Sequence, residues 1–178
     1  MVEPPETRVA LVSVRPRFAA ALLDGSKSVE VRRRRAHLAD GALCLLYASS
    51  PERALVGAIR VAHTDTDGPD ALWRRWGVRT TLDRAEFDAY LAGCAQACAI
   101  VVASAVAFTE PIGLHDLRRR HHAFVPPQSY RFLATGEYAS LLNGEAEQLE
   151  LVSPGCLTIA TKQMSLRPIA DAPAPRQN

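Results

Sequence analysis

A lysine, a glutamate and an arginine lie close together near the start of the chain, as Lys27, Glu30 and Arg32. The chain has 21 lysines and arginines, and all but Lys27 and Lys162 are arginines. A lysine ammonium can shift its pKa and turn its donors on a flexible stem, whereas a guanidinium is planar and always charged. Lys27 can therefore do what a guanidinium cannot, although an ordinary surface lysine beside a turn fits the same pattern.

The preceding segment predicts a helix that ends in a glycine turn. Pro16 suits a first helical position, and Phe18, Leu22 and Leu23 fall on one helical face. Gly25 can adopt the positive φ that commonly closes a helix. We therefore expect a helix over 16–24 that delivers the chain to Lys27.

The residues after this turn alternate as they do in a strand. Lys27, Val29, Val31 and Arg33 fall on one face, and Ser28, Glu30 and Arg32 fall on the other. A regular pleat would separate Lys27 from Glu30, so a shared site requires the turn at 25–26 to displace Lys27. The arginine run 32–35, read as part of this strand, is either a solvated edge that resists aggregation or a rim that contacts phosphate.

The segment 25–32, with the sequence GSKSVEVR, resembles the G-x-K-x-x-E-x-R signature of ASCH domains, a branch of the PUA-like superfamily associated with RNA. The match extends on both sides of this segment, with family-like pieces at 11–16 before it and at 45–51, 56–57 and 126–131 after it. The resemblance covers about residues 8–133. It implies that Lys27, Glu30 and Arg32 line a cleft beside a barrel.

The length of 178 residues suits one domain. The resemblance implies an α+β fold, a PUA-like mixed β-barrel of about five to six strands with flanking helices, and we expect a helical-hairpin insertion at about 69–93. The domain is expected to span 8–165, with a flexible N-terminus at 1–7 and a disordered, proline-rich tail at 166–178.

Its strands are expected in the segments 8–14, 42–48, 54–64, 97–108 and 149–159. A polar break is expected at 65–69, Glu110-Pro111 should end the fourth of these strands, and Gly57 should mark a bulge or a close backbone approach.

Composition narrows the class of protein. The net charge is +2, so a nucleic-acid site must be a local patch rather than a property of the whole chain. We expect no signal peptide, no membrane span and a cytoplasmic location. The four cysteines, Cys44, Cys94, Cys98 and Cys156, lack zinc-module spacing, so neither a metal nor a cofactor is expected.

The expected partner is RNA, a nucleotide or a nucleoside. If RNA is the ligand, the two basic clusters at 32–35 and 118–122 would form facing phosphate-binding lips, with Tyr47 or Tyr130 stacking a base. The cluster at 118–122 also fits a solvated helix end, where cations interact favourably with the helix dipole. Trp73 and Trp76 lie at helical spacing and are expected to be core residues. The expected nucleic-acid-binding residues are Arg15, Lys27, Glu30, Arg32, Arg33, Tyr47, Ser49, Arg118, Arg119, Gln128, Ser129, Tyr130 and Arg131.

Three functions remain open. The favoured one is a module that binds single-stranded or modified RNA in a basic cleft without chemistry. The alternatives are hydrolases of the ASCH family that use Lys27 and Glu30, either a ribonuclease or an amidohydrolase of N4-acetylcytidine. The amidohydrolase pattern has a threonine where this chain has Glu30. In the ribonuclease, Lys27 would stabilise the charge of the phosphorane, and Glu30 or a histidine would serve as the general base. The sequence leaves the oligomeric state and the RNA sequence open.

Overall fold

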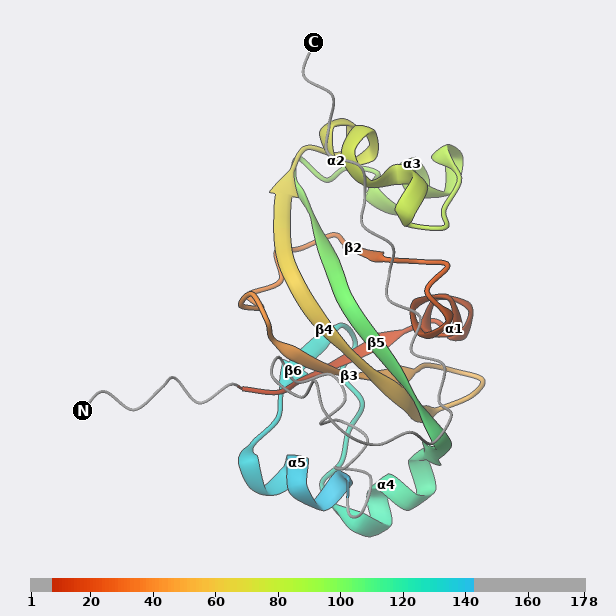
Figure 1. Cartoon of the computed structure of the whole chain (residues 1–178), viewed down its shortest axis with the longest axis vertical. Helices are drawn as coiled ribbons and strands as arrows, with labels where there is room; N and C mark the ends of the chain where they lie inside the picture. The colour runs from red at the N-terminus through yellow and green to blue at the C-terminus, as the bar shows by residue number, and fades with distance from the viewer. Residues whose placement is uncertain (1–7, 143–178) are drawn as a thin grey trace, which may run out of the picture.

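The computed structural model describes residues 8–142, which form a six-stranded mixed sheet flanked by helices (Figure 1). The strands are β1 (Ala10–Val14), β2 (Val29–Arg32), β3 (Leu43–Ala48), β4 (Ala54–Asp67), β5 (Ala97–Gly113) and β6 (Tyr130–Phe132). The helices are α1 (Pro16–Asp24), α2 (Pro69–Trp76), the 3-10 helix η1 (Gly77–Arg79), α3 (Arg84–Leu91), α4 (Leu114–Arg120) and α5 (Thr135–Leu141).

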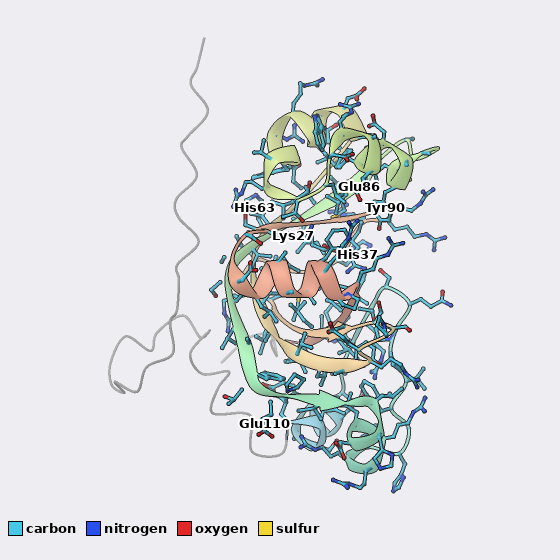
Figure 2. The ribbon with its side chains drawn as sticks, turned by 90° about the vertical axis from the view of Figure 1, so that its right-hand side faces the viewer. Lys27, His37, His63, Glu86, Tyr90 and Glu110 are labelled. Carbon is cyan, nitrogen blue, oxygen red and sulfur yellow. The ribbon has the colours of Figure 1, made fainter. Side chains whose placement is uncertain are left out.

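The strand order is β2-β5-β4-β3-β1-β6. The β1–β3 pair is parallel, and the other pairs are antiparallel. In Figure 2 the sheet curls around α1, which gives a half-barrel. The expected α+β fold with a barrel-like sheet and flanking helices is thus confirmed.

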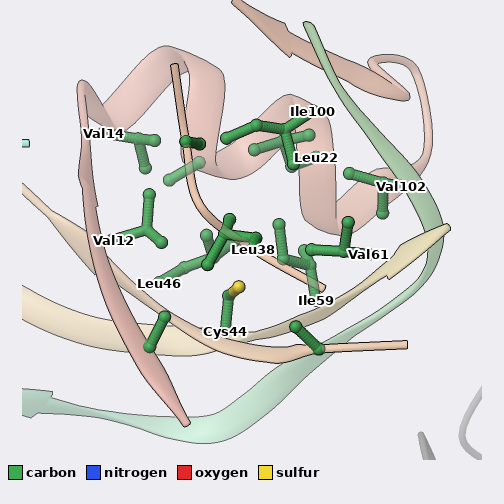
Figure 3. Packing of buried hydrophobic residues seen from close by; sticks show 14 of the residues in the cluster. Val12, Val14, Leu22, Leu38, Cys44, Leu46, Ile59, Val61, Ile100 and Val102 are labelled. Carbon is green, nitrogen blue, oxygen red and sulfur yellow. The ribbon is translucent and has the colours of Figure 1, made fainter. Parts of the chain in front are cut away.

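Helix α1 fills the concave side of the sheet and packs against β3, β4 and β5. Its first position is Pro16, and Gly25 ends it with φ 82°, as the sequence predicts. Leu22 is fully buried and packs in one apolar cluster with side chains of the sheet such as Val14, Leu46 and Ile100 (Figure 3). This contact fixes the helix, and with it the turn that leads to Lys27.

Gly57 allows the close packing of α1 on the β4–β5 pair. A Cβ atom at this position would lie 2.3 Å from the carbonyl oxygen of Val106 and 2.7 Å from Leu23 Cδ2. The β4–β5 register also shifts between Leu55 and Gly57. Both expectations for this glycine, a bulge and a close approach, are confirmed.

Strands β4 and β5 are longer than the sequence predicts. The expected polar break at 65–69 is wrong, because β4 continues and pairs Asp67 with Ala97. The expected end of β5 at Glu110-Pro111 is wrong as well. Along the β4–β5 pair, Gly57 is paired with Ala107 and the next paired residues are Leu55 and Ile112. Pro111 therefore lies in a stretch of β5 that is not paired with β4, where a proline without an N–H removes no hydrogen bond between the strands.

The long β4–β5 pair carries the helical hairpin of α2, η1 and α3 at its far end (Figure 1). Asp83 and Glu86 form the predicted capping box at the start of α3. Trp73 packs on Phe87 with 5.0 Å between ring centroids, and Trp76 packs against the same apolar cluster. The tryptophans therefore serve the packing of the hairpin, as expected.

Several expectations fall outside the described residues. They concern the N-terminus at 1–7, the strand at 149–159, the tail at 166–178 and Cys156. Within residues 8–142, no helix is long and apolar enough to cross a membrane, and no group of histidine, cysteine, aspartate or glutamate side chains could hold a metal ion.

Candidate functional site

Lys27 and Glu30 share one site because the strand begins after Lys27. The backbone N–H of Lys27 donates to Ala21 O at 2.9 Å, and that of Ser28 donates to Arg79 O at 3.1 Å. Strand β2 starts at Val29, so the two-residue alternation does not yet apply at Lys27. Lys27 Nζ lies 3.3 Å from Glu30 Oε2. The turn thus displaces Lys27 as a shared site requires.

Glu30 lies between two buried cations. Its Oε2 faces Lys27, and its Oε1 lies 3.1 Å from Arg32 Nη2. The exposed fractions are 1% for Lys27, 8% for Glu30 and 9% for Arg32. Arg32 also donates to Ser13 O at 2.9 Å and to Ser129 Oγ at 3.5 Å. One carboxylate therefore neutralises one of the two positive charges, and the cluster keeps a net positive charge.

Two atoms of this cluster differ sharply in their partners. Lys27 Nζ donates to Thr80 O at 2.6 Å and lies 4.8 Å from the centre of the Phe18 ring. Burial lowers the pKa of Lys27, and the attraction of Glu30 opposes this shift. Arg32 Nε, in contrast, is buried without a hydrogen-bond partner in the described part of the chain. A buried N–H without a partner costs free energy, so such a donor is a candidate to bind a ligand or a water molecule.

These residues line a cavity of about 520 Å³. The end of β1 and the first turn of α1 supply one side of the cavity, which includes Arg15, Arg17 and Phe18. Four cationic side chains, Arg15, Arg17, Lys27 and Arg32, and two carboxylates, Glu30 and Glu86, line it in total. The excess of positive charge suits an anionic ligand.

The helical hairpin forms the opposite side of the cavity, a role that the sequence left open. Leu82, Glu86, Ala89 and Tyr90 line the cavity from the hairpin. In Figure 2, Lys27 lies between α1 and this hairpin, with Glu86 and Tyr90 across from it. The hairpin is therefore a wall of the site rather than an element packed elsewhere on the sheet.

Arg33 helps to fix this wall. It donates to Tyr90 O at 2.6 Å and to Ala92 O at 3.1 Å, at the end of α3. These carbonyls have no partner within the helix, and a cation also interacts favourably with this end of the helix dipole. Across the cavity, Arg17 Nη2 lies 2.8 Å from Glu86 Oε1.

Comparisons with known proteins agree with this architecture. No protein-family model matches the chain. A curated protein of Zymomonas mobilis subsp. mobilis, named an ASCH domain-containing ribonuclease, is 29% identical over 143 residues, which cover 80% of this chain and 96% of that protein. The crystal structure of ASCH from Zymomonas mobilis is also 29% identical, has a TM-score of 0.73 and matches 78% of this chain and 96% of its own. This chain is thus similar in sequence and in fold to ASCH domain proteins.

A more distant structure shares only the fold. A hypothetical protein from Leishmania major is 16% identical, with a TM-score of 0.52 over 79% of this chain and 96% of its own. The half-barrel with its flanking helices therefore extends beyond the sequence relatives of this chain.

The cavity brings together six of the residues that the sequence predicts for the site. They are Arg15, Lys27, Glu30, Arg32, Ser49 and Gln128. Ser129 joins them indirectly through its contact with Arg32. Their role in binding RNA stays a prediction. The sequence missed the opposite wall and Arg17, because nothing local shows which helix will face the signature.

The other predicted residues have different surroundings. Tyr47 is only 3% exposed and packs on Phe124, so its ring has no open face for a base. The Tyr130 hydroxyl accepts from the His37 N–H at 3.0 Å, and its ring packs edge-on against Phe132. Neither tyrosine lines the cavity.

The two basic clusters do not form facing lips at this cavity. Strand β2 ends at Arg32, so Arg33 and residues 34–35 lie beyond the strand and are exposed, which corrects the expectation that the run continues the strand. Arg118 and Arg119 lie on α4, at the end of the sheet opposite the hairpin (Figure 1), and do not line the cavity. Arg131 is paired with Glu137.

Proposed function

We propose that this ASCH domain binds single-stranded RNA, takes one nucleotide into the cavity and cleaves the adjacent phosphodiester. The observation that carries the proposal is the pair of buried cations, Lys27 and Arg32, which share a single carboxylate, Glu30. The name of the Zymomonas mobilis relative, a ribonuclease, supports cleavage over binding alone.

The size of the cavity supports an unpaired nucleotide as the ligand. A volume of about 520 Å³ lies in the range of small-molecule sites and is too small for a duplex. Proteins that recognise RNA commonly take splayed-out bases from single strands in this way. The apolar parts of Phe18, Leu82 and Tyr90 would contact the base, and the cations would contact phosphate.

In the proposed reaction, the ribose 2′-oxygen attacks the neighbouring phosphorus and the bond to the 5′-oxygen breaks. Glu30 accepts the proton of the 2′-hydroxyl, and the 5′-oxygen takes up a proton from water as it leaves, so the products are a 2′,3′-cyclic phosphate and a 5′-hydroxyl. Lys27 and Arg32 stabilise the charge that develops on the phosphorane oxygens. No histidine lines the cavity within residues 8–142, which favours Glu30 over a histidine as the base.

Removal of the acyl group from N4-acetylcytidine is the second candidate. The specific observation in its favour is a nucleoside-sized cavity with a desolvated lysine beside a carboxylate. A desolvated lysine with a lowered pKa is a better nucleophile or base than an ordinary one. The two candidates differ in whether a phosphodiester is needed.

The test combines labelled single-stranded RNA with wild type and Lys27→Met. The exposed Arg74 on α2 lies outside the cavity, so Arg74→Gln is a control that removes the same charge. Anisotropy over a salt series measures binding, a denaturing gel measures cleavage, and chromatography follows N4-acetylcytidine.

We expect cleavage that Lys27→Met slows by about 100-fold or more and that Arg74→Gln retains. Salt-sensitive binding of RNA that stays intact would contradict cleavage and support a module that binds RNA without chemistry. Turnover of N4-acetylcytidine without RNA cleavage would favour the second candidate. Cleavage that both variants retain would place the reaction outside this cavity.

A further inference from the structure

The mouth of the cavity contains an ion pair that the proposed reaction does not use. Arg17 extends from the first turn of α1, and Glu86 reaches it from α3 on the opposite wall, at 2.8 Å. Both side chains line the cavity, and 56% of the Arg17 side chain and 39% of the Glu86 side chain are exposed. A carboxylate thus lies at the entrance of a cavity whose charge otherwise suits an anion.

A second guanidinium lines the same cavity as this pair. Arg15 lines the same cavity, and the described part of the chain offers its side chain neither a hydrogen bond nor an ion pair. The first turn of α1 contains no acidic residue. Arg15 and Arg17 are therefore two cations that line one cavity, and Glu86 is the carboxylate that pairs with Arg17.

We propose that Arg15 and Arg17 form a second phosphate subsite at the cavity mouth, and that the Glu86 carboxylate occupies it until a ligand phosphate displaces it. The proposal rests on the proposed function in one respect, since the phosphate would be that of the nucleotide next to the one in the cavity. A carboxylate and a phosphate both accept from a guanidinium in bidentate fashion, so one can replace the other.

The surroundings of Glu86 fit a side chain that can leave Arg17 without unfolding the helix. Glu86 Oε2 also accepts from the Asp83 N–H at 3.4 Å, as part of the capping box, and this bond does not involve Arg17. Arg33 holds the end of α3 separately through Tyr90 O and Ala92 O. Arg17 keeps the pKa of Glu86 below its usual value, so the competing group is a full negative charge at neutral pH.

The variants are chosen to separate competition from general electrostatics. Glu86→Gln removes the charge but keeps an oxygen that can serve the capping box. Asp88→Asn removes the same charge from the same helix; Asp88 pairs with Arg84 and does not line the cavity. Arg17→Gln and the double variant Arg17→Gln/Glu86→Gln complete a double-mutant cycle.

Anisotropy of a short labelled single-stranded RNA at low salt is the first readout. We expect Glu86→Gln to tighten binding by about fivefold, the scale of one exposed ion pair, and Asp88→Asn to change it by less than about twofold. Arg17→Gln should weaken binding and remove the gain from Glu86→Gln. An equal gain in the Arg17→Gln background, or no gain from Glu86→Gln in a folded protein, would overturn the proposal.

Inorganic phosphate provides a second readout that does not depend on RNA. Phosphate should raise the Tm of Glu86→Gln more than that of wild type, and Arg17→Gln should abolish the difference. If wild type binds no RNA, the proposed function fails and the phosphate series alone decides on the subsite. Equal phosphate-induced shifts in Tm in all variants would then refute the proposed phosphate subsite.

Discussion

Replacing Glu30 and replacing Lys27 should have very different effects on stability, although both residues belong to one buried ion-pair cluster. At separations of 3.3 Å to Lys27 and 3.1 Å to Arg32, each pair gains about 5 kcal/mol with an effective dielectric constant of ~20. Desolvation of each buried ion costs several kcal/mol and offsets most of this gain. The sign of each substitution therefore depends on which charges it leaves behind.

Glu30→Gln leaves two buried cations without their carboxylate. Removing one partner of a buried pair typically costs about 3–5 kcal/mol, because the remaining charge is uncompensated. Lys27 can lose its proton more easily in this variant, which limits the cost. We expect a loss of about 3 kcal/mol in the free energy of unfolding at neutral pH.

Lys27→Met should leave the stability within about 1 kcal/mol of wild type. Glu30 keeps Arg32 as its partner, and Thr80 O still accepts from the Thr81 hydroxyl at 2.6 Å. The methionine side chain suits the position against Phe18. The double variant Glu30→Gln/Lys27→Met should accordingly be more stable than Glu30→Gln alone.

Urea denaturation of the four proteins measures these differences, with Glu52→Gln, an exposed glutamate in a turn, as the control for the loss of a carboxylate. A cost of about 3 kcal/mol or more for Lys27→Met would refute the reasoning, because it would mean that the buried ammonium is strongly stabilising. Equal stabilities of Glu30→Gln and wild type would refute it from the other side.

Two further predictions follow from single residues. The folded-state pKa of Lys27 lies below 10.5, so between this lowered pKa and 10.5 the unfolded chain binds more protons than the folded chain. Wild type should therefore gain stability relative to Lys27→Met as pH rises through that window. Urea titrations of both proteins at a series of alkaline pH values check this, and a constant difference in stability would contradict it. Gly57→Ala should lower the free energy of unfolding by about 3 kcal/mol or more, because the new Cβ would lie 2.3 Å from Val106 O. Gly136→Ala, where the new Cβ would have no atom within 4 Å, should be neutral or slightly stabilising. Tm measurements distinguish the two variants, and a neutral Gly57→Ala would contradict the observed close approach.

The parts of the structure that the sequence predicts correctly depend on short-range signals. The proline start of α1, the glycine that ends it and the capping box of Asp83 and Glu86 each involve residues a few positions apart. The signature site follows from the same local turn, since Lys27 and Glu30 are separated by three positions. Such features depend little on the rest of the fold.

The parts that the sequence does not predict depend on distant partners. Arg33 could be a phosphate contact or a helix cap, and its contact with Tyr90 O, 57 positions away, exists only after the hairpin docks. Arg118 and Arg119 form a basic cluster in any conformation, but the sheet places α4 far from the hairpin. Pro111 is tolerated in β5 because of a register shift that no local pattern announces.

The hairpin that forms one wall of the cavity also shields an edge of the sheet. Strand β2 is an edge strand, and Ser28, just before it, donates its N–H to Arg79 O and accepts from Arg79 Nε at 2.7 Å. Exposed edge strands template pairing with other chains. A variant that shortens the β4–β5 connection would therefore uncover this edge as well as open the cavity, and its expected failure is self-association into oligomers or aggregates rather than a smaller folded domain.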